Sequence, residues 1–199
     1  MPLAFRADTA ITICCPQNND VNKVVADGPQ AARTKVREMV EYGADLSKMG
    51  AAGGVRSKGD KAGAQQLTLE EMKAIVEEAH KPGRHVAEHV HGTTNIRDAI
   101  LTGADSVEHG SLIDTEGIKL ARERGTYLAM DIYNADYILR AGEKAGFLPE
   151  SLEKGTSNWP VKAHQGRARM AFGSDAGIFP HGNNVKQFFY MVKYGITPV

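Results

Sequence analysis

Short apolar runs alternate with helical patterns from about residue 29 to the end of the chain. In the helical stretches apolar residues recur every three or four positions, as at Met72, Ile75, Val76 and Ala79. The runs between them have the length of β-strands. Strands that alternate with amphipathic helices are typical of βα units and a parallel sheet. We count five or six such units, fewer than the eight that close a TIM-type barrel, and therefore expect an incomplete (βα)₈ barrel of parallel strands with outer helices.

Local signals set the limits of these elements. The expected strands are 44–49, 85–90, 105–109, 126–131 and 169–174. The expected helices begin at Pro29, after Thr68 and after Asp114, and further helices are expected over 94–101, 137–145, 149–154 and 183–194. Thr68 and Glu71 form a capping-box pattern, and Pro82-Gly83 ends the helix that follows it. Residues 14–20 and 155–166 fit no element well, the latter because Pro160 lies where a helix should run.

Composition changes this picture little. The chain has 199 residues with 24 basic and 24 acidic side chains, so its formal net charge is zero. That balance gives no reason to expect nucleic acid as a partner. No secretory signal and no apolar stretch of about 20 residues is visible, so we expect a cytoplasmic protein without a membrane span. The adjacent Cys14 and Cys15 are expected to be reduced. We treat 1–199 as one partial barrel in which 1–24 is poorly defined.

Residues able to do chemistry stand at the ends of the expected strands. Lys48, His89 with His91, His109 and Asp175 each end or follow one strand. The carboxyl ends of barrel strands meet at one pole, where active sites lie. Any one histidine could be purely structural, but the whole set favours a metal site, because zinc prefers imidazole and carboxylate ligands.

Several of these positions have alternative roles. A lysine at Lys48 is more often an ion-pair partner or a phosphate binder than a ligand, and Gly53-Gly54 beside it could form an anion-binding turn in an unrelated barrel. Asp175, which we expect to be buried, could cap a turn or act as a ligand or general base. Side chains that could line a substrate pocket are His91, Asp131, Tyr133 and His181.

Four segments resemble one known family. They are SKMGAAGGV (47–55), AEHVHG (87–92), SVEHG (106–110) and AFGSDAG (171–177). In this order and spacing they resemble the amidohydrolase superfamily, in its prolidase-like and imidazolonepropionase-like branch. The resemblance implies a (βα)₈ barrel that holds one or two divalent metal ions, usually zinc.

The resemblance also implies roles for individual residues. Lys48 matches a lysine that is carbamylated and binds metal, His89 and His109 match imidazole ligands, and Asp175 matches an aspartate ligand. His91 could exchange roles with His89 or, like Tyr133 and His181, contact substrate. The implied reaction is hydrolysis of an amide, in a dipeptide or an N-acyl amino acid, by metal-bound hydroxide, with Asp175 as the proton shuttle.

The chain departs from the family pattern before Lys48. The family's first strand carries its own His-x-His pair, which is absent here. We therefore expect either a fragment or a degraded relative, and the alternative function is a catalytically silent protein that at most binds metal. An incomplete barrel leaves apolar surface and strand edges uncovered, so a homo-oligomer is also expected.

Overall fold

A parallel six-stranded sheet forms the centre of the protein. The computed structural model describes residues 10–12, 26–52, 63–145 and 159–196. Its strands are β1 (Ala10–Thr12), β2 (Leu46–Gly50), β3 (His85–Val90), β4 (Ser106–His109), β5 (Tyr127–Met130) and β6 (Arg169–Phe172). They lie side by side in chain order, each parallel to the next. Within the described ranges β1 does not pair with β6, so the sheet is part of a barrel, as predicted, and is not closed.

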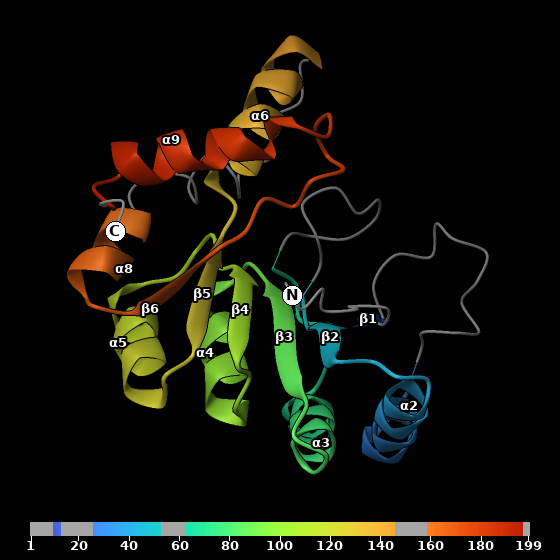
Figure 1. Cartoon of the computed structure of the whole chain (residues 1–199). Helices are drawn as coiled ribbons and strands as arrows, with labels where there is room; N and C mark the ends of the chain where they lie inside the picture. The colour runs from blue at the N-terminus through green and yellow to red at the C-terminus, as the bar shows by residue number, and fades with distance from the viewer. Residues whose placement is uncertain (1–9, 13–25, 53–62, 146–158, 197–199) are drawn as a thin grey trace, which may run out of the picture.

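Helices follow the strands along the chain. They are α2 (Pro29–Glu41), α3 (Leu69–His80), α4 (Thr93–Thr102), α5 (Thr115–Arg124), α6 (Ile132–Ala145), α8 (Trp159–Gln165), the 3₁₀ helix η1 (Asn183–Val185) and α9 (Lys186–Lys193). Figure 1 shows α3, α4 and α5 lining one side of the sheet, whereas α6 and α9 lie beside each other beyond the ends of the strands. None of the helices in the described ranges combines the length and the apolar composition that crossing a bilayer requires.

Side-chain caps begin two helices as the sequence predicts, and glycines end two helices. Thr68 accepts a hydrogen bond from the backbone N–H of Glu71, whose carboxylate accepts from the Thr68 N–H, which completes the capping box. Asp114 caps α5 by accepting from the Gly117 N–H at 2.8 Å. Gly103 and Gly125 end α4 and α5 with φ of 98° and 75°, a left-handed conformation that glycine adopts without strain.

The apolar residues of strands and helices form two buried clusters. One joins α2, α3 and β2, and includes Val36, Met49, Met72 and Ile75. The other joins β3, β4 and β5 to α4 and α5, and includes Val90, Ile96, Ile100, Val107 and Leu128. Since strand side chains alternate, the opposite faces of these strands are free to carry polar groups.

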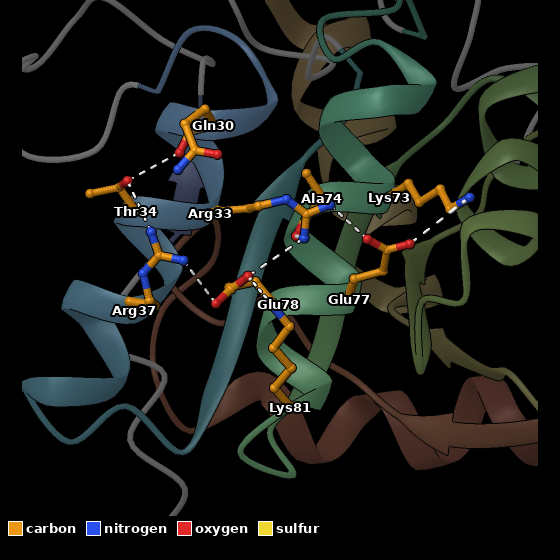
Figure 2. A network of polar contacts seen from close by, with 9 residues as sticks. All are labelled: Gln30, Arg33, Thr34, Arg37, Lys73, Ala74, Glu77, Glu78 and Lys81. Carbon is orange, nitrogen blue, oxygen red and sulfur yellow. Dashed lines mark hydrogen bonds and ion pairs between the residues drawn. The ribbon is translucent and has the colours of Figure 1, made fainter.

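Ion pairs connect α2 with α3. Figure 2 shows Arg33 and Arg37 of α2 reaching Glu77 and Glu78 of α3, with Lys81 on the same carboxylate as Arg37. Glu78 is only 5% exposed, so it is stable there as an anion because several cations surround it. The network fixes the packing of two outer helices and lies outside the predicted site.

The structure departs from the sequence prediction at a few elements. The strand β1 was not predicted, and α6 begins at Ile132 rather than at Tyr137. Pro160 lies in the first turn of α8, where a proline is tolerated because that N–H has no helical partner. The helix expected over 149–154 falls outside the described residues, as do Cys14, Cys15 and Gly53-Gly54.

Candidate metal centre

The register of the sheet brings the predicted residues to one end. Gly50 pairs with His89, and Lys48 pairs with Ala87, two residues earlier on β3. Residues that pair in a parallel ladder point to the same face, so Lys48 and His89 share a face of the sheet. Val90 pairs with His109 on the next strand. Three neighbouring strands therefore present their candidate ligands at the same rim.

Three imidazole rings meet at this rim. The ring centroids lie 4.8 Å apart for His89 and His91, 4.5 Å for His89 and His109, and 5.0 Å for His91 and His109. One nitrogen from each ring lies within 4.8 Å of the others. His91 Nδ1 is 3.0 Å from the hydroxyl of Ser111, which fixes the orientation of that ring and leaves Nε2 for another partner.

His109 reaches the cluster through an unusual backbone conformation. Val107 is buried on the helix-facing side of β4, and strict alternation would place His109 on the same side. His109 instead has a φ of 69°. A left-handed conformation is strained for a residue with a side chain, at about 1–3 kcal/mol. Strain at the residue that joins the other imidazoles is consistent with a functional position.

A carboxylate pair lies on the other side of His109. Asp131 Oδ2 is 2.7 Å from His109 Nδ1. The side-chain amide of Asn134 donates to Asp131 Oδ2 at 3.0 Å and to Asp175 Oδ2 at 2.9 Å. Ligand atoms of His109, Asp131 and Asp175 lie within 4.8 Å of one another. His109 is therefore common to an imidazole group and a carboxylate group, both of a size that could hold a metal ion.

Burial keeps two of the imidazoles neutral. Burial lowers the pKa of His89 to about 2, assisted by the positive charges of His109, His91 and Lys48. Burial likewise lowers the pKa of His91 to about 4, with a contribution from His109. Only a neutral imidazole has a nitrogen lone pair free for a metal, so both rings are in the form that binds a cation at neutral pH.

His109 and Asp131 each shift the pKa of the other toward its charged form. Burial alone would lower the pKa of His109, but the charge and hydrogen bond of Asp131 outweigh it and raise that pKa. Burial also opposes ionisation of Asp131, yet His109 and the hydrogen bond from Asn134 bring its pKa down to about 2. A carboxylate that holds a ring nitrogen in this way orients a metal-binding histidine in many proteins.

The polar groups present fit a divalent cation. The Nε2 atom of His89 is buried and has no hydrogen-bond partner among the described residues, which is costly unless something else binds it. Three imidazoles and two carboxylates are the ligand types that zinc and its neighbours prefer. Lys48 is half-buried on the face of the sheet that carries His89, and its positive charge acts to lower the pKa of both His89 and His109.

The remaining predicted site residues differ in their burial and in their contacts with the cluster. Asp175 is exposed, and the expectation that it is buried was wrong, because in the described ranges no strand covers the outer edge of β6. Tyr133 is 7% exposed and packs against Phe179, with ring centroids 4.7 Å apart. His181 is exposed, and within the described ranges no hydrogen bond, ion pair or ring contact joins it to the cluster. The substrate contacts of Tyr133 and His181 stay predictions.

Sequence reasoning missed Asn134 and Ser111. Asp131 appeared only as a pocket-lining candidate, although it directly contacts His109. One signal was available for Asn134, since it follows Asp131 by three residues at the start of a helix, where such a pair can bond. Its second bond, to Asp175, spans 41 residues and has no local signature.

The chain is similar to known hydrolases over most of its length. The model of the Amidohydrolase family matches residues 7–198. The ochratoxinase of Aspergillus niger is 35% identical over 183 residues, which are 88% of this chain and 37% of that protein. A crystal structure of a Xaa-Pro dipeptidase with bound methionine in the active site is 36% identical, with a TM-score of 0.78, and the match covers 86% of this chain and 44% of that one.

A further solved structure has a similar fold. A prolidase complexed with N-methylphosphonate-L-proline is 28% identical, with a TM-score of 0.76 and coverage of 86% and 44%. The chain thus spans less than half the length of these relatives. Since the family model covers nearly the whole chain, and two relatives exceed 30% identity over most of it, the protein belongs to the amidohydrolase family.

Proposed function

We propose that the protein is a metal-dependent hydrolase of amide bonds. The observation that carries the proposal is the convergence of His89, His91 and His109 with Asp175 around one rim, where the buried His89 Nε2 has no protein partner among the described residues. Structural histidines would be expected to satisfy their nitrogens within the protein. A cation is the partner that suits this whole set.

The residues that would hold the cation are His89, His109 and Asp175, with His91 in place of His89 as the alternative. Lys48 would join them only as a carbamate, because an ammonium group has no lone pair to offer. A divalent cation held there would polarise the carbonyl of the scissile amide. It would also lower the pKa of a water molecule, so that the water loses a proton more readily and becomes a better nucleophile.

Asp175 is the proposed proton shuttle. It is exposed at the rim, so water and substrate can reach it. Its Oδ2 accepts a hydrogen bond from Asn134, which leaves Oδ1 to accept the proton of the attacking water. As the C–O bond forms and the C–N bond breaks, the same oxygen would return that proton to the leaving amine nitrogen.

The proposed substrates are dipeptides or N-acyl amino acids. The similar structures are a Xaa-Pro dipeptidase and a prolidase, and they support this class because they share the fold and over a quarter of the aligned residues. Residues proposed to contact the substrate are His91, Tyr133 and His181.

The test is zinc-dependent hydrolysis by the purified chain. Protein freed of metal with a chelator and reloaded with zinc should release amino acids from a panel of dipeptides and N-acyl amino acids. His109→Ala should abolish this activity, whereas His164→Ala, an exposed histidine of α8, should not change it. Hydrolysis that persists without metal, or in His109→Ala, would contradict the proposal.

A silent metal-binding protein is the second candidate. The open sheet and the exposed Asp175 favour it, because a site open to water loses much of the electrostatic advantage of a closed one. Stoichiometric zinc binding that depends on His109, without turnover of any substrate in the panel, would support this candidate.

A further inference from the structure

The position of Asp175 depends on one neighbouring side chain. Among the described residues, its side chain makes one hydrogen bond, which Asn134 Nδ2 donates to Oδ2 at 2.9 Å. Asp175 is exposed, and its φ of 48° is strained for a residue other than glycine. An exposed carboxylate on a strained backbone would sample several positions without that bond.

Asn134 itself is firmly held. It is 4% exposed and lies in the first turn of α6. The neighbouring N–H of Tyr133 donates to Gln187 Oε1 at 2.8 Å, which fixes this turn against α9. Asn134 also donates to Asp131 Oδ2 at 3.0 Å. The amide must present its NH₂ group to the two carboxylates, because its oxygen would repel them.

We propose that Asn134 is a positioning residue that holds the carboxylate of Asp175 beside His109, so that Asp175 can bind the cation and transfer the proton. This inference rests on the proposed function and extends it to a residue that touches neither cation nor substrate. The simpler role for Asn134 is that of a helix-start residue, which bonds Asp131 three positions earlier. That role requires no contact with Asp175.

Zinc affinity separates the two roles. Zinc binding to the metal-free chain would be measured by competition with a chromophoric chelator. Asn134→Leu removes both donors, and we expect it to weaken zinc binding by roughly 10–100-fold, as loss of a residue that orients a ligand does. Asn134→Ser keeps one hydroxyl donor, so its zinc affinity should lie between those of the wild type and Asn134→Leu. The matched control is Asn95→Leu, which replaces another buried asparagine, whose amide donates to the Gly63 carbonyl and, among the described residues, to no carboxylate. This substitution should leave zinc affinity unchanged.

A double-mutant cycle shows whether Asn134 acts through Asp175. In an Asp175→Ala background, Asn134→Leu should change zinc affinity by no more than about twofold, because the group that it positions is gone. The inference is overturned if Asn134→Leu causes an equal loss of zinc affinity in both backgrounds, or causes no loss in the otherwise wild-type chain. The Asn134→Ser cycle gives the same answer if Asn134→Leu fails to fold.

The two proposals fail in different ways. A wild-type chain that binds zinc but hydrolyses no amide contradicts the proposed function. The double-mutant cycle on zinc affinity then still decides the role of Asn134. Active enzyme whose zinc affinity is indifferent to Asn134 contradicts only the inference. A chain that takes up no zinc at all overturns both.

Discussion

His109 Nδ1 lies 2.7 Å from Asp131 Oδ2, and this contact joins the end of β4 to the residue that follows β5. Both groups are largely buried, with 12% and 14% of their side chains exposed. A charge pair in such surroundings interacts more strongly than one in water. The contact therefore sets both the orientation of the His109 ring and its protonation.

Replacement of Asp131 should change the titration of His109. In Asp131→Asn the negative charge that raises the pKa of His109 is gone, while the burial that lowers it remains, so that pKa should fall. Histidine NMR signals of the metal-free chain, followed against pH, would measure this. An unchanged pKa of His109 in the variant would contradict the assigned cause.

Mild acid should destabilise the metal-free protein through His89 and His91. Their folded pKa values, about 2 and about 4, lie below the ordinary 6.5, so between pH 6.5 and 4 the unfolded chain binds more protons than the folded one. Stability must then fall as the pH falls. Urea unfolding at pH 7, 6 and 5 would follow the loss, and His91→Gln should make it shallower. His109 should affect stability in the opposite direction. Its pKa is raised in the folded state, so the stability that it contributes is lost as the pH rises through that folded pKa.

Replacement of Glu88 should stabilise the fold. Glu88 is fully buried on the face of β3 opposite to His89, and neither carboxylate oxygen has a hydrogen-bond partner among the described residues. An unsatisfied buried polar group costs about 1–3 kcal/mol, so Glu88→Met should raise the free energy of unfolding by an amount of that order.

The gain from Glu88→Met should depend on pH. Burial, followed by the charge of Asp98, raises the pKa of Glu88 well above its usual 4.5. Above pH 4.5 the unfolded chain therefore loses a proton that the folded chain keeps, and this opposes folding increasingly as the pH rises. Denaturant unfolding should show a larger benefit of the substitution at pH 7 than at pH 4.5. A loss of stability at both values would contradict this account.

We expect the chain to self-associate through the region of β6 and α9. Phe172 is 42% exposed and stacks on Phe188, and Phe189 and Val192 are 71% and 54% exposed on the same helix. Exposed apolar surface beside an unpaired strand edge favours association. Light scattering after size-exclusion chromatography should show oligomers that Phe189→Lys reduces and Leu101→Lys, a change on α4, does not. A stable wild-type monomer would contradict the expectation.

The alternation of strands and helices could be predicted because it depends on local patterns. Thr68 and Asp114 start their helices as predicted, and the rim carrying Lys48, His89 and His109 follows from their places at strand ends. The exposure of Asp175 depends on which strands lie beside β6, and the left-handed backbone of His109 depends on its neighbours in space. Neither is encoded by nearby residues, so the sequence pattern alone could not reveal them.

The bond between Tyr133 and Gln187 connects the last helix to the chemistry of the rim. Gln187 is fully buried, and its side-chain oxygen accepts the N–H at the beginning of α6. Shortening the polypeptide to end before residue 186 would remove this anchor and free the turn that carries Asn134. Variants that alter the chain after residue 185 would therefore change the surroundings of Asp175, the proposed proton shuttle.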